Sequence, residues 1–530
     1  MSEERKTPSK VVYEIACTKI RELVISQENS NEVYAVININ NQFETISLSS
    51  KRAQDWLRAL DTEVHGKQFY QSILEKIASK AQISEVRKEV IHNRIAFEND
   101  VIYYDLARKD GRIVKISTSG VEVIPYQTDM PFFRKSSSTQ EQVEPRYGDN
   151  EALEKLTQLS RIKDAQIYQV HLTAFFLEHI PIPIMDFDGP AGTMKSTDSS
   201  LTKRIVDPNG IKTEDNISSM PKKIDDMNIQ MYNRYQIVYD NLSYISKEVS
   251  DTLCKAITGS SNSKRTLYTD MDEIILSIKR KLIINGISPN LERPDLQDRI
   301  ISYEREPLER DDRLTEEEIE EKFHELLPSI LGQIFDTLKK AMEIHKQVKK
   351  EIKPRRRMAD FEIWGEAISR ALGYKSYSFL EKYHEKIRKK SISLIESQPL
   401  VKAIVSLLEK TPIYENSMED TFYHLKEIGI GLGIDVGSKY ERFPKSSSIL
   451  SRELTIVEPH LAKLGIKYQK TNYSKHDGRF KPNTAVVSFT KIENSEGSEA
   501  SEDTSLFFEL KENKENIKKI KIVDYFSIVP

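Results

Sequence analysis

The sequence has few of the residues that disulfide-rich or zinc-binding proteins need. Its 530 residues include only two cysteines, Cys17 and Cys254, which are too few for a disulfide framework and show no metal-ligand spacing. The ten histidines are scattered and form no zinc-like cluster with one another or with cysteine. This composition indicates a reducing, cytoplasmic compartment.

Long apolar runs are also lacking. The N-terminus, MSEERKTPSK, has no apolar signal-peptide core. The most apolar stretch, residues 170–187, carries Glu178, His179 and two prolines, and is too short and too broken to cross a membrane. Charge of one sign is not in excess either, because 30% of the residues are charged but the net charge is only -3. Any surface for nucleic acid must therefore be local.

Residues 182–197, IPIMDFDGPAGTMKST, join a mostly apolar run to a loop with the spacing of a phosphate-binding P-loop. In the pattern G-x-x-x-x-G-K-[ST], backbone N–H groups surround the phosphates, the lysine reaches the β- and γ-oxygens, and the hydroxyl holds magnesium. Met194 stands where the second glycine normally supplies positive φ, so we expect the loop to form without that freedom, helped by Gly192. The alternative is an ordinary strand, turn and helix with a surface lysine. The predicted nucleotide-binding residues are Gly189, Pro190, Ala191, Gly192, Thr193, Met194, Lys195, Ser196 and Thr197.

Three further polar residues follow in an order that fits a nucleotide site. Residues 235–241 form a second apolar run that delivers Asp240, and residues 281–286 form a third that delivers Asn285. Because ligands bind at the carboxyl ends of parallel strands, we expect Asp240 at a magnesium ion and Asn285 near the γ-phosphate or the attacking water. Arg299 follows in a segment that can project from a helix toward another subunit. Strand-end Asp and Asn often merely cap a helix, so each residue alone is a weak signal.

The order Lys195, Asp240, Asn285, Arg299 resembles the AAA+ ATPase family, with its Walker A, Walker B, sensor 1 and arginine-finger residues. Within that family it resembles the ring helicases of viral superfamily 3, the minichromosome-maintenance helicases and, most of all, the helicase parts of phage and plasmid primase-helicases. Met194 fits the comparison, since minichromosome-maintenance helicases also place a non-glycine residue before the P-loop lysine. The resemblance implies ATP and Mg²⁺ as cofactors, with Ser196 and Asp240 at the metal. It also implies a homo-oligomer, a hexamer, in which Arg299 completes a neighbour's site.

Asn241 departs from the family pattern. AAA+ proteins commonly follow the Walker B aspartate with a glutamate that activates water, and an amide cannot act as a base. Either another carboxylate, such as Glu248 or Asp251, does this work, or hydrolysis is slow.

The predicted fold class is α/β, with a P-loop AAA+ core, a helical lid, an N-terminal α/β domain and a C-terminal winged helix. Strand alternation at 33–39, helical periodicity at 53–80 and three strands within 101–123 indicate the N-terminal domain, and the polar segment 136–149 reads as a linker. The predicted domains are 1–145, an α/β collar or DNA-contacting domain; 150–290, the ATPase core; 291–395, the lid with sensor 2; 396–492, the winged helix; and 493–530, an acidic linker and tail.

Three basic clusters are candidate functional contacts. The segment TGSSNSKRTLYTD, with Lys264 and Arg265, looks like a hairpin with a basic tip, and in the resembling rings a hairpin in this interval enters the pore and grips DNA. Arg357, which opens a helix, resembles the sensor 2 arginine that folds over the γ-phosphate. Arg479 and Lys481 lie in the predicted wing, where they would contact phosphate. The plainer alternatives are a solvated loop, a basic surface cluster and a winged helix used for protein contacts.

Residues 518–530, KKIKIVDYFSIVP, have an aliphatic and two aromatic residues at the spacing of a sliding-clamp-binding tail, although a final strand on the winged helix accounts better for the β-branched residues. We predict a replicative DNA helicase of phage, plasmid or mobile-element type, with DNA as its partner and no membrane contact. Two alternatives stay open: an AAA+ DNA-binding switch or loader without unwinding activity, and a degenerate P-loop scaffold.

Overall fold

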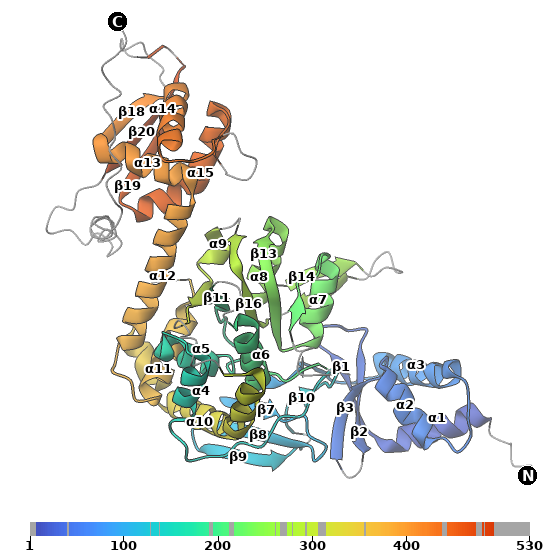
Figure 1. The fold of residues 1–530 in the computed structure, drawn as a ribbon. Coiled ribbons are helices and arrows are strands. Elements are labelled where there is room, and N and C mark those ends of the chain that lie inside the picture. The colour runs from blue at the N-terminus through green and yellow to red at the C-terminus, as the bar shows by residue number, and fades with distance from the viewer. Residues whose placement is uncertain are drawn as a thin grey trace, which may run out of the picture. The chain divides into compact units, whose positions relative to one another are not determined.

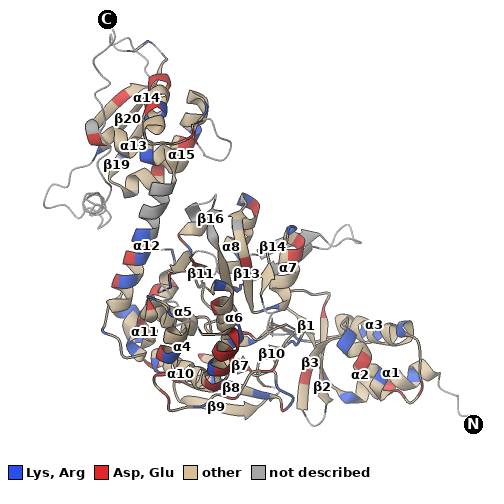
Figure 2. Cartoon of the chain, in the orientation of Figure 1, with Lys and Arg blue, Asp and Glu red and all other residues tan. Residues whose placement is uncertain are grey.

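The computed structural model divides the chain into two units, Met1–Tyr383 and His384–Pro530. Figure 1 shows helices and strands alternating over most of the chain. Figure 2 shows acidic and basic residues interspersed on both units, as expected for a net charge of -3. The structure describes residues 7–39, 42–127, 129–136, 138–189, 194–210, 217–259, 261–265, 273–277, 279–291, 294–305, 314–353, 357–436, 443–472, 480–481 and 483–491.

The first unit begins with an α/β layer. Its sheet has the order β3-β2-β1-β4, and three helices pack against it over an apolar cluster that includes Trp56 and Leu74. The strand predicted at 33–39 is confirmed, whereas the helical periodicity predicted over 53–80 belongs to two helices. The elements are α1 (Pro8–Lys19), β1 (Ile20–Ser26), β2 (Val33–Ile39), β3 (Gln42–Ser47), α2 (Lys51–Leu60), α3 (Lys67–Ile83) and β4 (Lys88–Glu89).

An antiparallel sheet in the order β6-β7-β8-β9 follows. The three strands and two turns predicted within 101–123 are confirmed as the last three strands of this sheet. A separate short pair joins β5 to β10. The elements are β5 (Ile91–His92), β6 (Ile95–Glu98), β7 (Val101–Asp105), β8 (Arg112–Ser117), β9 (Gly120–Pro125) and β10 (Phe132–Phe133).

The segment 136–149, predicted as a linker, is instead held against its neighbours by buried hydrogen bonds. Gln142 is 3% exposed, and its Nε2 donates to two carbonyls in the last turn of α6 (Lys195–Val206). Arg94, fully buried, donates to a carbonyl of this segment and also pairs with Asp207, just after α6. Polar residues that resemble a solvated linker thus satisfy helix-end carbonyls that would otherwise have no partner.

The centre of the first unit is a parallel sheet in the order β12-β13-β16-β11-β17. Two helices precede β11, the first strand of this sheet along the chain, and an antiparallel pair, β14 and β15, stands outside the sheet. The elements are α4 (Ala152–Ser160), α5 (Ala165–Ala174), β11 (Ile184–Asp188), α6, β12 (Ser218–Ser219), α7 (Ile224–Asn233), β13 (Gln236–Ile245), α8 (Lys247–Thr258), β14 (Ser261–Arg265), β15 (Glu273–Ser277), β16 (Lys281–Leu291), α9 (Pro294–Gln297) and β17 (Ile300–Tyr303).

Crossover connections of this sheet run in two directions. From β11 the chain crosses through α6 to β12 at one edge, then returns through α7, α8 and α9 to β13, β16 and β17. Because such connections are right-handed, α6 covers one face of the sheet and α7 to α9 cover the other. The connections that leave the neighbouring strands β11 and β16 therefore run to opposite faces of the sheet, which makes a topological switch point. Ligands bind beyond the carboxyl ends of the strands at such a point.

The helices after β17 begin with α10 (Glu316–Glu351). A capping box between Thr315 and Glu318 opens it, and three glutamates in its first turn suit the positive end of the helix dipole. It packs on α4, α6 and α11 (Ala359–Ala371) and on β8 and β9. Gly332 permits close crossing, because a Cβ there would lie 2.1 Å from the carbonyl oxygen of Arg146. Helix α12 (Ser378–Ser397) continues the chain.

The second unit orders its elements as helix, strand, helix, helix, strand, strand, with the antiparallel sheet β18-β20-β19. The unit has three helices and a final hairpin, which share an apolar cluster that includes Leu454 and Phe489. The additional strand β18 is not predicted from the sequence, because its residues, IYENS, are mostly polar. The elements are α13 (Pro399–Lys410), β18 (Ile413–Ser417), α14 (Met418–Gly431), α15 (Ser447–Lys463), β19 (Ile466–Asn472) and β20 (Ala485–Lys491).

Candidate nucleotide site

The lysine predicted for the P-loop lies at the switch point of the parallel sheet. Strand β11 ends at Asp188, and α6 begins at Lys195. The Nζ of Lys195 donates to the carbonyl oxygens of Gly189, at 2.5 Å, and Gly286, at 2.7 Å. The ammonium group is therefore held between the ends of β11 and β16, at the edge where open α/β sheets bind ligands.

Ser196 and Asp240, predicted to hold magnesium, are in direct contact. The Ser196 hydroxyl donates to both carboxylate oxygens of Asp240, at 3.1 and 3.0 Å. Ser196 is exposed and Asp240 half-buried, so solvent and small ions can reach them. A hydroxyl and one carboxylate, with water and phosphate oxygens, suit the oxygen coordination of Mg²⁺.

The loop between Gly189 and Met194 is known only at its ends, because Pro190, Ala191, Gly192 and Thr193 lie outside the described residues. We expected the loop to form without positive φ at Met194, and that expectation is wrong. Met194 itself adopts the left-handed conformation, with φ 58° and ψ 26°, immediately before α6. A non-glycine residue in this region costs roughly 1–2 kcal/mol, so the local fold imposes the conformation against a penalty. Thr197 continues the first turn of α6.

Asn285 is 1% exposed, and both ends of its amide are engaged. Its Nδ2 donates to the Ser199 hydroxyl at 3.1 Å, and its Oδ1 accepts the backbone N–H of Asn241 at 2.9 Å. Asn285 thus joins three segments that meet at the site, namely β16, α6 and the irregular point of β13. A contact with the γ-phosphate stays a prediction, and in the described geometry this side chain positions its neighbours.

Asn241 also adopts the left-handed conformation, with φ 58°. This explains an asparagine at the position, because Asn tolerates that region better than Glu. The carboxylates considered as substitutes for the missing base, Glu248 and Asp251, are carried away from the site. Strand β13 continues for five residues beyond Asp240, roughly 16 Å, before the segment of α8 that holds them.

Gly286 is a site residue that the sequence analysis did not single out. A Cβ at this position would lie 2.0 Å from the carbonyl oxygen of Leu242, so any larger residue would force β13 and β16 apart. Its carbonyl accepts Lys195. The glycine in KLIING was a visible signal, since a glycine at a strand end often marks close backbone approach.

A buried ion pair joins the first turn of α6 to the segment that follows β17. Asp198, in the first turn of α6, is 1% exposed, and its Oδ2 lies 3.0 Å from Nε of Arg305. Burial raises the pKa of Asp198 to about 7, against the opposing effects of the Arg305 charge and a hydrogen bond with Ser160. No spacing rule relates residues so far apart in the sequence, so the pair could not be predicted.

Arg299 lies at the opposite edge of the sheet from the P-loop. Its carbonyl accepts the N–H of Ile184, the first residue of β11, at 2.7 Å, and β17 then runs parallel to β11. The P-loop begins five residues later, roughly 16 Å along the strand. Arg299 is therefore too far to act on a nucleotide bound to its own chain.

Arg357 is exposed. It precedes α11, whose Phe361 ring is 5.4 Å from the His171 ring, and His171 bonds the carbonyl of Pro183 just before β11. Glu320 of the adjoining helix α10 accepts two hydrogen bonds from Arg204, which lies at the far end of α6. These contacts do not bring Arg357 or α10 to the P-loop of the same chain, so the sensor 2 role and the lid stay predictions.

The predicted hairpin is present in the backbone. Strands β14 and β15 pair antiparallel, with Lys264 opposite Ile274 and Arg265 opposite Glu273, at the end nearest the turn. In the predicted wing, Arg479 lies outside the described residues, whereas Lys481 is exposed before β20. The tail at 518–530, with its proposed clamp motif, also lies outside them.

The described groups fit a magnesium nucleotide. The lysine ammonium and the serine–aspartate pair face the same edge, and the two carbonyls that bond the ammonium are groups that a phosphate could replace. Among the described residues, no three His, Cys, Asp or Glu side chains gather as a metal site, and the P-loop type of magnesium site does not require such a cluster. No helix among them is long and apolar enough to span a membrane.

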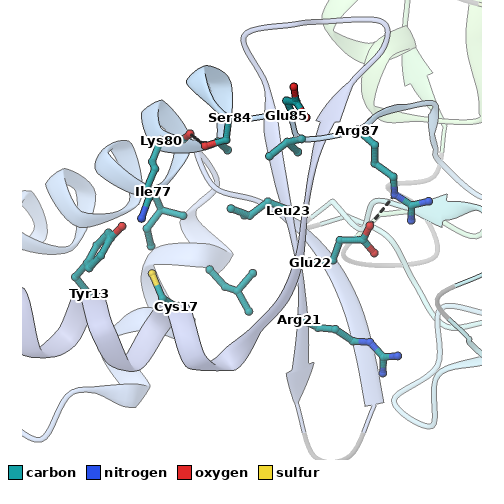
Figure 3. Close-up of a pocket in the computed structure, with 13 residues that line it drawn as sticks. Tyr13, Cys17, Arg21, Glu22, Leu23, Ile77, Lys80, Ser84, Glu85 and Arg87 are labelled. Atoms are coloured by element: carbon teal, nitrogen blue, oxygen red, sulfur yellow. Dashed lines mark hydrogen bonds and ion pairs between the residues drawn. The ribbon is translucent and has the colours of Figure 1, made fainter.

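A cavity of about 550 Å³ lies elsewhere, in the N-terminal α/β layer (Figure 3). Tyr13 and Cys17 of α1, Leu23 of β1 and Ile77 of α3 line it. It contains none of the candidate residues and no strand-end loop of the P-loop type. The position of the candidate nucleotide site therefore follows from the candidate residues, and this cavity is not part of that site.

Comparisons with known proteins match part of the chain to one family. Residues 151–385 match the family described as the actinomycete integrative conjugative element replication protein. No curated protein matches the chain. The structure is similar to the apo C-terminal region of NrS-1, with 13% identity, TM-score 0.40 and coverage of 92% of this chain and 100% of that one. It is also similar to SCCmec type IV Cch, described as an active helicase, with 12% identity, TM-score 0.46 and coverage of 89% and 93%.

Proposed function

We propose that this protein is an ATP-dependent DNA helicase that serves the replication of a mobile genetic element. One observation carries the proposal: Lys195, Ser196 and Asp240, chosen from spacing, lie at the carboxyl edge of a parallel sheet, where the Ser196 hydroxyl contacts Asp240 and the Lys195 ammonium bonds carbonyls at the ends of β11 and β16. The family match over residues 151–385 supports the replication context.

Each residue of the site has a distinct task. Lys195 would leave its two carbonyls to bind the β- and γ-phosphates, and Met194 with the loop before it would present backbone N–H groups. Ser196 and Asp240 would hold Mg²⁺, whose charge stabilises the phosphate oxygens during transfer. Asn285 would keep the first turn of α6 and the end of β13 in register.

The position of Arg299 supports an oligomer. Arg299 lies at the opposite edge of the sheet, too far from its own P-loop to serve it. An arginine that completes a neighbour's site stabilises the charge that develops on the transferred phosphate. We propose a ring, a hexamer as in the resembling helicases, with Arg299 acting in trans and α10 to α12 forming the lid region between subunits.

DNA would be held in two places. Lys264 and Arg265 near the turn of the β14–β15 hairpin would contact phosphate in the pore, which needs no sequence preference. The second unit would be a winged helix, a reading that its helix–strand–helix–helix–strand–strand order supports, and Arg479 and Lys481, between β19 and β20 in the sequence, would contact phosphate from its wing. A clamp contact through residues 518–530 is a further, separate hypothesis.

ATP hydrolysis with and without DNA tests the proposal. A helicase should hydrolyse ATP, should be stimulated by single-stranded DNA, and should unwind a forked duplex in the same buffer. Stimulation without unwinding at any enzyme concentration would favour the switch or loader. No turnover with any DNA would leave only the scaffold, and would contradict the proposal.

The second candidate is an AAA+ DNA-binding switch or loader. Asn241 favours it, because no carboxylate follows Asp240 and the described structure carries Glu248 and Asp251 away from the site. ATP binding could then drive assembly on DNA, with slow hydrolysis resetting it. Single-turnover hydrolysis compared with the dissociation rate of the DNA complex would separate this function from a motor.

A further inference from the structure

Two arginines bracket strand β17. Arg299 precedes the strand at the amino edge of the sheet, and Arg305 follows it at the carboxyl edge, near the P-loop helix. Five residues of mostly extended chain lie between them, and this places the two arginines roughly 20 Å apart. Since β17 stands at the end of the sheet order, beside β11, one strand leads from the nucleotide edge to the residue that the proposed function assigns to the neighbouring subunit.

Arg305 is tied to the first turn of α6. Its Nε lies 3.0 Å from Oδ2 of Asp198 and donates to the carbonyl of Ser160 at 2.8 Å, and the side chains of Arg305 and Asp198 are 6% and 1% exposed. The next residue of α6, Ser199, is held by Asn285 from the other side of β11. The two strands that flank β11 thus each place a residue, Asn285 or Arg305, in contact with one of two consecutive residues of α6.

This arrangement makes the helix and the strand move together. Separating a buried ion pair leaves two uncompensated charges away from water, so the pair resists being pulled apart. Lys195 and Ser196 lie within the same helical turn as Asp198. When they shift to engage phosphate, Asp198 shifts with them and draws Arg305 along.

We propose that Arg305 is a positioning residue, which transmits the state of the P-loop along β17 to Arg299 and so to the adjacent subunit. The inference rests on the proposed function, because it needs ATP at Lys195 and a trans role for Arg299. In this role Arg305 touches neither nucleotide nor magnesium. Its loss should therefore impair the site of the neighbour more than its own.

Mixed oligomers test this. Arg305→Gln subunits keep every pocket residue but deliver a poorly placed Arg299, whereas Asp240→Ala subunits have a defective pocket and an intact β17. Each should be nearly inactive alone yet bind a fluorescent ATP analogue. Mixed, they should regain activity by roughly tenfold or more, because a finger is worth about 10³ to 10⁵ in rate and part of the interfaces pair a good pocket with a good finger.

The controls keep the failure of each idea distinct. Arg204→Gln breaks an ion pair with Glu320 at the far end of the same helix, and should turn over ATP like the wild type. If the Arg305→Gln mixture stays inactive while a mixture of Arg299→Ala and Asp240→Ala recovers, Arg305 serves only its own pocket and the inference is wrong. If neither mixture recovers activity although the wild type hydrolyses ATP, Arg299 does not act in trans. The inference, which depends on that role, is then wrong as well.

A conservative variant covers loss of folding. Arg305→Lys keeps the charge beside Asp198 and should retain more activity than Arg305→Gln, with the same recovery on mixing. Should Arg305→Gln lack a cooperative melting transition, the mixing result for Arg305→Lys decides. Intermediate activity without any recovery would overturn the proposal.

Discussion

The hydroxyl of Ser196 donates to both carboxylate oxygens of Asp240, at 3.1 and 3.0 Å. Ser196 lies in the first turn of α6, which follows β11, and Asp240 lies on β13, with β16 between the two strands. Neither strand pairing nor apolar packing requires this contact. The contact brings together oxygen atoms from two motifs 44 residues apart, and such a group of oxygens suits magnesium. We therefore locate the candidate site at this contact.

The first prediction concerns Lys195. Lys195→Ala should abolish ATP turnover and leave the melting temperature nearly unchanged, because the ammonium is half-exposed and, among the described residues, bonds two carbonyls at strand ends and not the apolar core. Steady-state hydrolysis and thermal melts measure the two effects. Lys247→Ala, on the exposed surface of α8, is the control and should behave like the wild type. Wild-type turnover in Lys195→Ala would remove the central assignment.

Much of the fold was readable because apolar periodicity and turn chemistry agree with it. The strands around the P-loop, the 101–123 strands and the helices of the second unit each carry a local pattern of their own. The buried roles of Gln142 and Arg94 were not readable, because a polar residue in a loop looks the same whether it caps a helix or faces water. Such partners are set by tertiary contact.

The site shows the same division. Lys195, Ser196 and Asp240 follow spacing rules that reflect strand–loop–helix geometry, so sequence alone brought them together. The positive φ of Met194 and the Asp198–Arg305 pair depend on how segments meet in space. Arg299 was readable as a candidate, but only the register of β17 with β11 shows that its own P-loop is out of reach.

The second prediction tests the trans arginine. Arg299→Ala and Asp240→Ala proteins should each be nearly inactive, and their mixture should regain activity, because one kind of mixed interface joins an intact pocket to an intact finger. A finger worth about 10³ to 10⁵ in rate makes even partial rescue measurable in a hydrolysis assay. Inactivity at every mixing ratio would show that Arg299 acts in its own chain or structurally.

The third prediction assigns Asn241 a backbone role. Asn241→Gly should hydrolyse ATP at close to the wild-type rate, because glycine adopts φ 58° freely and keeps the N–H that donates to Asn285. Asn241→Val should lose both activity and stability, since a β-branched residue in this region costs more than the roughly 1–2 kcal/mol typical of the left-handed conformation. Turnover and urea unfolding measure these effects. Loss of turnover in the glycine variant would mean that the amide side chain takes part.

The fourth prediction concerns pH and Lys281, which is buried and donates to the carbonyls of Leu177 and Ile180. Burial lowers the pKa of this lysine from 10.5 to about 7, with Glu178 acting against the shift. Between these values the unfolded chain binds more protons than the folded one, so the free energy of unfolding rises with pH, by at most about 1.4 kcal/mol per unit. Below pH 7 the contribution is constant.

Lys281→Met should remove this rise. Urea unfolding at pH 7, 8 and 9 should show the wild type gaining stability relative to the variant at each step. Lys247→Met, on the exposed surface of α8, is the control, and its slope should follow the wild type. Parallel pH profiles for wild type and Lys281→Met would contradict the prediction.

The last prediction places DNA handling in the β14–β15 hairpin. Lys264→Ala with Arg265→Ala should leave basal ATP hydrolysis nearly unchanged and reduce both its stimulation by DNA and unwinding, because it removes groups that bind DNA phosphate and none that binds the nucleotide. The salt dependence of DNA binding should fall by about 1 in logarithmic slope for each DNA phosphate that the variant no longer neutralises. Fluorescence anisotropy over a salt series and a forked-duplex assay measure these effects.

The predicted wing supplies the matched comparison. Arg479→Ala with Lys481→Ala removes the same amount of charge from the second unit, and should weaken the first binding of DNA while sparing stimulation by saturating DNA. The defect of the hairpin variant should persist at saturation, because it affects the grip during translocation and not the encounter. If the hairpin variant translocates normally and only the wing variant fails, DNA is held outside the pore. The switch or loader then becomes the better description of this protein.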